Sequence, residues 1–204
     1  IRPGLDDKSL TSWNSLMLKG YVDAYMTFKE KHHLDIALKN ANFIVNTQMS
    51  EDGKLLHSYK DGRSTINAYL EDYSLTISAF IRLYEATFDT KWLTYSEKLT
   101  EYAIAHFYDT KSGMFFFTSD LDPELVARKM EINDNVMPAS NSVMANSLFD
   151  LGTILGKDNY KEMSIKMLNN VKPEMDSYAS GYANYATLML KQVSPYYEIA
   201  IVGK

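Results

Sequence analysis

The feature that most constrains this sequence is a repeated pair of amphipathic helices. Apolar residues recur at the spacing of an α-helix through most of the chain. The joins within successive pairs are only a few residues long, and short joins produce antiparallel helical hairpins. We therefore predict an all-α fold of repeated antiparallel hairpins at about 9–49, 69–107 and 139–171, followed by a seventh helix at 178–191.

The hairpins share an internal repeat. Asn14-Ser15-Leu16 opens the first hairpin, Tyr73-Ser74-Leu75 the second and Asn141-Ser142-Val143 the third. A turn with an extended stretch follows the first two hairpins, at Asp52–Ser58 and Ser112–Thr118. Because paired helices run antiparallel, each extended stretch returns the chain to the same end of the array. We expect short β-hairpin loops at that end, where residues far apart in sequence become neighbours.

The repeat also predicts how the chain is divided. Three hairpins and an unmatched helix indicate part of a larger ring, so we assign residues 1–194 to one partial domain. Residues 195–204 form a strand-like tail, and an isolated strand is not stable alone. The tail is therefore expected to lead into a region outside this segment. The start at Ile1, without Met, predicts that the segment belongs to a longer protein.

Composition excludes several functional classes. Net charge is −5 and Lys and Arg are scattered, which argues against a nucleic-acid groove or an anionic membrane surface as the main partner. There are no cysteines, so disulfides and thiolate chemistry are absent. Metal-ligand spacings and a glycine-rich phosphate loop are also missing, and we predict no metal and no cofactor. A cytoplasmic location is the default expectation.

Candidate chemistry gathers at the predicted loop end. A site that handles sugars needs carboxylates for proton transfer and aromatic faces against the ring. We assign Glu71 or Asp72 as general acid or base and Asp6 or Asp7 as the second carboxylate. The predicted substrate-binding residues are the ring platforms Trp13 and Tyr73, the polar binders Asn14, Arg63 and Asn141, and the neighbouring His57, Tyr59 and Ser140.

Each of these residues also has a structural explanation. Ser140 can cap a helix, and the acidic residues are favoured near helix starts by capping and by the helix dipole. Trp13 and Tyr73 lie on apolar stripes, where packing in the core is the commoner role. Taken singly, the structural explanation is favoured at every position. Taken together on one face, the residues favour a site about as strongly as they favour a set of caps.

Four motifs in a fixed order carry a resemblance to a known family: Arg2–Lys8, Thr11–Asn14, Leu70–Tyr73 and Pro138–Ser142. Over essentially the whole chain the sequence resembles the thioredoxin-domain-containing proteins related to spermatogenesis-associated protein twenty. The resemblance implies a C-terminal α/α toroid, the six-hairpin glycosidase-like fold that also houses N-acylglucosamine and cellobiose epimerases. It matches Asp6-Asp7-Lys8, Trp13-Asn14, Glu71-Asp72-Tyr73 and Ser140-Asn141 residue by residue. No histidine of the chain is placed on the catalytic histidines of the epimerases.

Three functional hypotheses follow. The leading one is a carbohydrate-active toroid segment, hydrolase-like or epimerase-like, that binds a sugar-like small molecule at the loop end. The second is a non-catalytic helical module that binds or positions a partner, such as the thioredoxin-like domain that the resemblance implies elsewhere in the full-length protein. The third is an enzyme whose active site needs residues from outside this segment.

Overall fold

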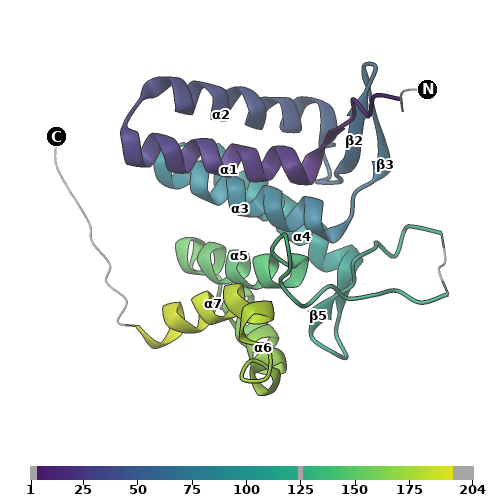
Figure 1. Ribbon diagram of the computed structural model, residues 1–204, viewed down its shortest axis with the longest axis vertical. Coiled ribbons are helices and arrows are strands. Elements are labelled where there is room, and N and C mark those ends of the chain that lie inside the picture. Colours follow the sequence, from purple (N-terminus) through teal and green to yellow (C-terminus); the bar gives the residue numbers. More distant parts are fainter. Residues whose placement is uncertain (1–3, 124–125, 195–204) are drawn as a thin grey trace.

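The computed structural model describes residues 4–123 and 126–194, and these form three antiparallel helical pairs and a further helix (Figure 1). The predicted hairpins are confirmed. The strand-like tail lies outside the described residues, and the division of the chain at residue 194 stays a prediction. The α-helices are α1 (Thr11–Phe28), α2 (Lys31–Phe43), α3 (Leu70–Thr87), α4 (Lys91–Phe107), α5 (Ser140–Leu155), α6 (Asp158–Val171) and α7 (Ala183–Val193).

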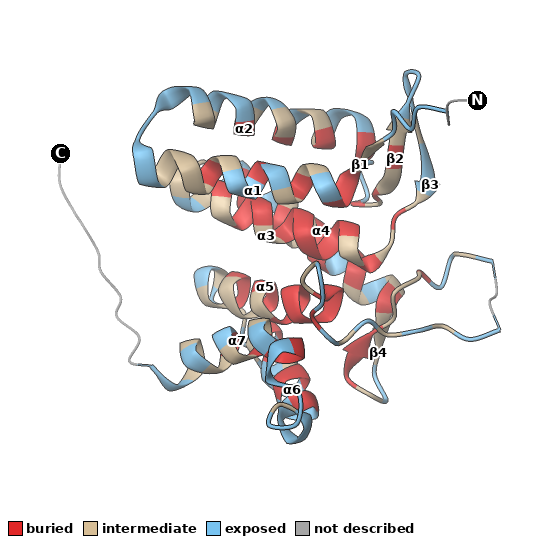
Figure 2. Cartoon of the chain, viewed as in Figure 1, coloured by how far each residue is buried: buried red, intermediate tan, exposed pale blue. Residues whose placement is uncertain are grey.

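The helices form two layers. In the inner layer α1 packs on α3, α3 on α5 and α5 on α7, while α2, α4 and α6 each pack outside the inner helix that precedes them. The central inner helix, α3, is therefore covered by α1, α4 and α5, and among the described elements it has the largest number of buried residues (Figure 2). Each large apolar side chain fully buried there contributes about 1.5–3 kcal/mol.

The seventh helix begins later than the sequence predicts. Residues Ala179–Tyr182 form a 3-10 turn, η3, and α7 starts at Ala183. The carbonyl of Gly181 accepts a hydrogen bond from the amide of Asp134, and its amide donates to the carbonyl of Tyr178. A side chain at Gly181 would also collide with the Tyr178 ring. The turn is therefore held by tertiary contacts that helical periodicity does not report.

Each of the first three inner helices ends on a residue in the left-handed conformation: Lys29 with φ 60°, Phe88 with φ 56° and Gly156 with φ 67°. At each end the amide of this residue donates back to a carbonyl four residues earlier. This is the usual helix-ending motif, and glycine adopts it without steric cost. The repeat therefore fixes the backbone of these turns more strictly than it fixes the residue type.

The extended segments lie together at the opposite end of the pairs (Figure 1). The first forms an antiparallel sheet in the order β1-β2-β3, from Ser9–Leu10, Leu56–Lys60 and Arg63–Asn67. The second is a two-stranded ribbon of β4 (Tyr108–Asp109) and β5 (Met114–Phe115). Short turns complete the path at η1 (Ile44–Gln48) and η2 (Lys172–Glu174). The predicted gathering of the loops at one end is confirmed. Within the described residues, no helix is both long and apolar enough to cross a bilayer.

Candidate functional site

Asp72 connects three segments of the chain at the loop end of the molecule. It lies in the first turn of α3 and its side chain is fully buried. Its Oδ1 accepts a hydrogen bond from the amide of Ser12, and its Oδ2 accepts from the amide of Tyr69 and from Nδ1 of His57, each at 2.9 Å. A buried carboxylate is stable only when it is satisfied in this way. Asp72 therefore joins the starts of α1 and α3 to strand β2, and its oxygens are occupied.

His57 is oriented by this junction. Because a carboxylate only accepts, Nδ1 of His57 carries the proton in the hydrogen bond to Asp72, and Nε2 is the nitrogen left for other partners. The ring meets the edge of Tyr69 at 5.0 Å between centroids, and Tyr69 stacks on Phe117 at 5.1 Å. The hydrogen bond to Asp72 raises the pKa of His57 above its usual 6.5, against an opposing effect of burial. The imidazole is thus fixed in position and favoured in its charged form.

Glu71 is half-buried beside this pair. Burial is the main cause of a raised pKa at Glu71, and the neighbouring charges of Asp72 and Glu131 raise it further. His57 and the Ser12 hydroxyl oppose that shift only in part. A carboxyl with a raised pKa is a stronger base than an exposed one and can exchange protons closer to neutral pH.

The same three side chains place potential ligand atoms within 4.8 Å of one another: His57, Glu71 and Asp72. This grouping has no metal-ligand spacing along the chain, because His57 comes from β2 and the two acids from α3. Asp72 already accepts three hydrogen bonds, so an acid–base pair oriented by a carboxylate describes this group better than a metal centre. A second such group, Glu30 with His32 and His33, lies at the turn between α1 and α2.

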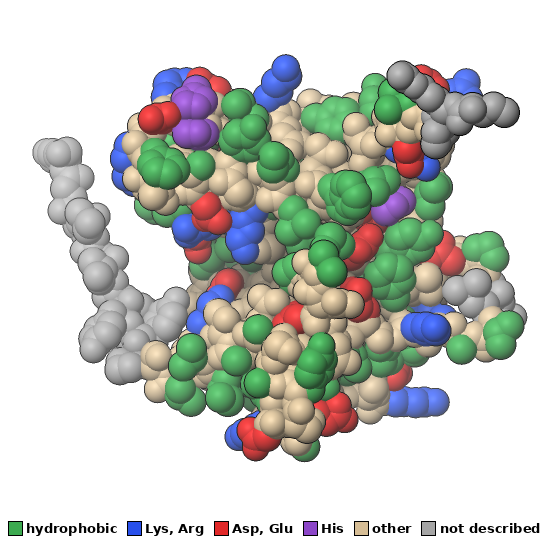
Figure 3. Space-filling view, in the orientation of Figure 1, with side chains coloured by type: hydrophobic (Ala, Val, Ile, Leu, Met, Phe, Trp, Pro, Cys, Tyr) green, Lys and Arg blue, Asp and Glu red, His purple; other side chains and the backbone are tan. Residues whose placement is uncertain are grey.

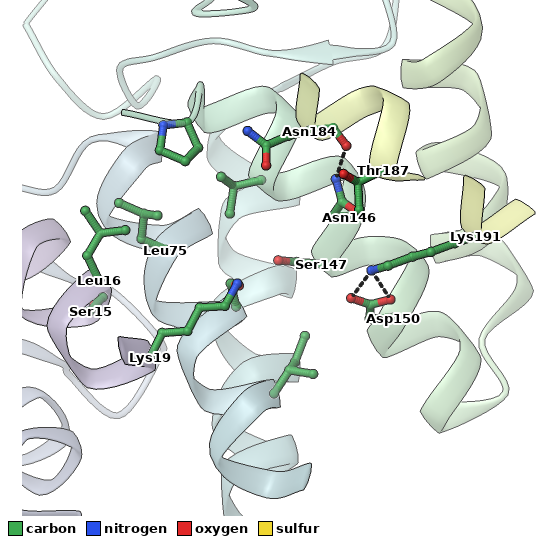
Figure 4. Close-up of a pocket in the computed structure, with 14 residues that line it drawn as sticks. Ser15, Leu16, Lys19, Leu75, Asn146, Ser147, Asp150, Asn184, Thr187 and Lys191 are labelled. Atoms are coloured by element: carbon green, nitrogen blue, oxygen red, sulfur yellow. Dashed lines mark hydrogen bonds and ion pairs between the residues drawn. The ribbon is translucent and has the colours of Figure 1, made fainter. Parts of the chain in front are cut away.

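A cavity of about 200 Å³ lies along the inner helices, and its lining does not include His57, Glu71 or Asp72. Its walls come from α1, α3, α5 and α7 and from Pro138 (Figure 4). On α3 the cavity is lined by Leu75 and Ser78, which follow Glu71 at the four- and seven-residue spacings of one helix face. Glu71 therefore lies about 6 Å along α3 from the first lining residue of this helix.

The carboxylates predicted in the N-terminal segment have different surroundings. Asp6 is exposed and lies 3.4 Å from Lys8. Asp7 lies 2.5 Å from Lys60, and this contact lowers the pKa of Asp7. A lowered pKa is the wrong direction for a general acid at neutral pH. The structure therefore brings Glu71 and Asp72 together but gives Asp6 and Asp7 surface ion pairs.

Four predicted binding residues occupy the first helix and the β2–β3 hairpin. Trp13 is 62% exposed on α1 and is free to meet a ligand or another protein surface. The Asn14 side chain donates to the carbonyl of Leu10 within its own chain segment. Tyr59 packs edge-on against Phe43 at 5.1 Å. Arg63 is exposed beside the hairpin turn.

Tyr73 and Asn141 are structural. The Tyr73 hydroxyl accepts the amide of Leu55 at 2.8 Å, and Asn141 Oδ1 accepts the amide of Phe115 at 2.9 Å. These are equivalent positions of the repeat, so both side chains tie an inner helix to the extended segment before it. Tyr73 is fully buried and stacked on Tyr102, which corrects its predicted role as a ring platform. Asn141, also fully buried, has no free group to bind a hydroxyl.

Ser140 lies at the start of α5, where its amide donates to Glu131 Oε2 at 2.9 Å. Its hydroxyl is buried without a hydrogen-bond partner among the described residues. Glu131 belongs to the long loop before α5 and was missed in the sequence, as were the cavity residues Lys19, Asp150 and Lys191. The signal available for the cavity residues was the spacing of polar side chains along the inner face of each first helix.

Relatives of known sequence are longer than this chain. A protein of Caenorhabditis elegans without an assigned function is 30% identical over 168 residues, which are 78% of this chain and 23% of that protein. Human spermatogenesis-associated protein 20 is 26% identical over 184 residues, 85% of this chain and again 23% of its own length. The chain is homologous to spermatogenesis-associated protein 20. It spans about a quarter of the length of these relatives. No family model matches the chain.

The resemblance expected from the motifs is confirmed to this extent. Neither relative is named for a thioredoxin domain, so that part of the resemblance stays a prediction.

Solved structures identify the fold as part of an α/α toroid, as the repeat predicts. Cellobiose 2-epimerase from Bacillus thermoamylovorans superposes with a TM-score of 0.68 at 13% identity, covering 83% of this chain and 46% of the epimerase. A GH76 α-mannanase from Bacteroides thetaiotaomicron gives 0.66 at 13% identity, covering 84% and 46%. Unsaturated glucuronyl hydrolase from Bacillus sp. GL1 gives 0.65 at 10% identity, covering 85% and 49%. At these identities the likeness shows the fold alone.

Proposed function

We propose that this toroid segment binds a carbohydrate on the inner face of its first helices and isomerises or epimerises it by proton transfer. Glu71 is the base and the charged His57 is the acid. The observation that carries the proposal is their pairing: a half-buried carboxyl with a raised pKa beside an imidazole that Asp72 orients. The toroid fold that the chain shares with sugar-processing enzymes supports a carbohydrate as the substrate.

The two pKa shifts are consistent with Glu71 as the base and His57 as the acid. Glu71 removes the proton from the carbon next to the carbonyl of an open-chain sugar, and His57 gives its Nε2 proton to the carbonyl oxygen. An enediol results. For isomerisation, Glu71 then gives its proton to the neighbouring carbon and His57 takes the proton of the other enediol hydroxyl, which becomes the new carbonyl. For epimerisation, Glu71 returns its proton to the opposite face of the same carbon and His57 takes back the proton that it gave, so both groups regain their starting states. Because the base must be deprotonated and the acid protonated, activity is expected between the raised pKa of Glu71, above 4.5, and the raised pKa of His57, above 6.5.

Hydrolysis by two carboxylates receives less support from the same geometry. A glycosidase needs a second free carboxyl across the scissile bond. Asp72 is occupied by three donors, and Asp7 pairs with Lys60. Glu131 has one oxygen on the amide of Ser140. Glu131 is thus the remaining candidate for the second carboxyl, and one of its two oxygens is already engaged.

Deuterium exchange tests the proposal directly. The protein is incubated with D-glucose, D-mannose, D-glucuronate and cellobiose in D₂O, and proton NMR follows the signal of the carbon-bound hydrogen next to the carbonyl. We expect exchange with at least one sugar, reduced by about 100-fold or more in Glu71→Gln. Glu162→Gln is the matched control, because Glu162 is exposed on the outer helix α6.

The melting temperature of Glu71→Gln shows whether a loss of exchange comes from the missing base or from unfolding. Removing the half-buried charge of Glu71 should leave stability unchanged or slightly higher, as expected where a group serves function at a cost in stability. Undiminished exchange in a folded Glu71→Gln protein would refute the assignment of the base. Release of free sugar from a glycoside without exchange would replace isomerisation with hydrolysis.

A second function is supported by one surface. The solvent-exposed face of α1 carries Trp13, Met17 and Phe28, which are 62%, 57% and 65% exposed. Large apolar patches of this kind often mark protein interfaces. The partner proposed from the family resemblance is a thioredoxin-like domain. Its addition should shift the emission of Trp13 to the blue, and the shift should be absent in Trp13→Phe; an unchanged spectrum would count against docking on α1.

A further inference from the structure

The cavity between the inner helices contains two lysines with different environments. Lys191 Nζ lies 2.8 and 2.7 Å from the two carboxylate oxygens of Asp150, so its charge is neutralised within the protein (Figure 4). Lys19 extends from α1 into the same space, and its Nζ donates to the Ser78 hydroxyl at 3.2 Å (Figure 4). Across residues 4–123 and 126–194, Lys19 has no carboxylate partner. The cavity walls therefore carry one uncompensated positive charge.

Uncharged polar groups line the same cavity as this ammonium. Ser147 and Asn184 line the cavity, and neither side chain makes a hydrogen bond within the described part of the chain. The Asn146 amide donates to the carbonyls of Ser142 and Asn184, which leaves its oxygen free to accept. Acidic and basic side chains follow the boundary between α1–α3 and α5–α7 (Figure 3). The cavity thus offers a cation, hydroxyls and amides to a ligand.

We propose that this cavity binds the anionic group of an acidic sugar, the carboxylate of a uronic acid or the phosphate of a sugar phosphate, through Lys19. An ammonium facing an anion makes a charge-assisted hydrogen bond, about twice as strong as a neutral one. A cavity of about 200 Å³ is smaller than the 300–1,000 Å³ of typical drug-sized sites and suits a monosaccharide. This inference rests on the proposed function, since it specifies the sugar that the same site takes.

The position of Lys19 relative to Glu71 supports that specification. Ser78, which holds the ammonium of Lys19, lies seven residues after Glu71 on the same face of α3. The axial separation of the two residues is about 10 Å. A sugar whose anionic group meets Lys19 can therefore extend its opposite end toward Glu71 and His57. The ion pair of Asp150 and Lys191 also lines the cavity, and because its net charge is zero it does not compete with Lys19 for the anion.

Binding of four probes tests the inference: D-glucuronate, D-glucose 6-phosphate, D-glucose and inorganic phosphate, titrated into the protein and followed by amide NMR shifts. We expect one of the two acidic sugars to bind about tenfold or more tightly than D-glucose, and which one it is separates carboxylate from phosphate recognition. Lys19→Gln should abolish this preference. Lys39→Gln, which removes a charge from the exposed side of α2, should leave it intact.

Each of the other possible outcomes overturns a specific statement of the proposal. D-Glucose binding as tightly as both acids, or a preference that survives Lys19→Gln, overturns the role of Lys19 while the proposed sugar site stands. Binding of inorganic phosphate without any sugar shows an anion site and refutes both statements. An absence of binding by all four probes refutes the cavity as a sugar site and the inference with it. Amide spectra of each variant establish that the fold is retained.

Discussion

Two buried carboxylates join neighbouring inner helices, and they differ in one partner. Asp72 accepts the amides of Ser12 and Tyr69 at the starts of α1 and α3. Asp134 accepts the amide of Ala139 before α5 and the amide of Asn184 in α7. The third hydrogen-bond donor differs: it is His57 for Asp72 and the Ser142 hydroxyl for Asp134.

This difference gives one junction a group that can exchange protons near neutral pH and leaves the other with a structural role only. Both carboxylates satisfy helix N-termini, where backbone amides lack partners and the helix dipole favours negative charge. A serine hydroxyl does not titrate near neutral pH, whereas a histidine does. The same structural device therefore becomes a candidate catalytic device only at the α1–α3 junction. Asp72 is a positioning residue there, and the groups that exchange protons are its neighbours.

The largest expected effect comes from removing either carboxylate. Asp72→Ala and Asp134→Ala each leave several buried donors unpaired, which costs about 3 kcal/mol. For a chain of this size the melting temperature should fall by roughly 6–12 °C. Calorimetry of both variants measures whether the two junctions are equivalent in stability.

The two variants should differ in a second measurement. Only the loss of Asp72 should lower the pKa of His57, measured from the histidine ring signals by NMR, because the hydrogen bonds of Asp134 go to two amides and a hydroxyl. In Asp134→Ala the His57 titration should match that of the native protein. A fall in stability of less than about 1 kcal/mol in Asp134→Ala would show that the comparison of the two junctions is mistaken.

Much of the fold could be predicted from the sequence because it repeats. Helical periodicity located the three hairpins, and their antiparallel order placed Glu71 and Ser140 at the same end. The roles of Tyr73 and Asn141 could not be predicted, because their hydrogen bonds go to backbone amides of other segments. Glu131 was missed for a similar reason, since it lies in a loop with no periodicity. Local patterns locate elements, whereas tertiary hydrogen bonds decide which polar residues stay free.

A smaller effect is expected from pH, and it tests the histidine alone. The pKa of His57 is raised in the folded protein, so the folded state holds this proton more tightly than the unfolded chain does. The resulting stability is fully present below the unfolded pKa of about 6.5 and is lost as pH rises through the folded pKa. We expect the melting temperature of the native protein to fall over this range by more than it does in Asp72→Ala, where the partner that raises the pKa is absent.

The matched variants are His57→Gln and Asp134→Asn. The pH-dependent fall should be weaker in His57→Gln and unchanged in Asp134→Asn, because only the first variant removes the titrating group. The other groups facing His57 are Tyr69, Glu71 and Lys8, of which Glu71 also has a raised pKa. The pH range in which Glu71 affects stability begins at its ordinary pKa of 4.5, below the range of His57. The melting temperatures are therefore compared from pH 6.5 upward. An equal fall in native protein and His57→Gln would assign the effect to another group.

The smallest expected effect concerns the other ends of the inner helices, where the two halves differ again. α1 ends on Lys29 in the left-handed conformation, whereas α5 ends on Gly156. A residue with a side chain loses about 1–2 kcal/mol in this conformation, offset in part by the greater freedom of glycine in the unfolded chain. Lys29→Gly should therefore stabilise the protein by about 0.5–1 kcal/mol, and Gly156→Ala should destabilise it by about 1 kcal/mol. Urea denaturation measures both. If the two substitutions shift stability in the same direction, the left-handed turns are not equivalent, and the repeat that relates the α1–α3 half to the α5–α7 half fails at the helix ends.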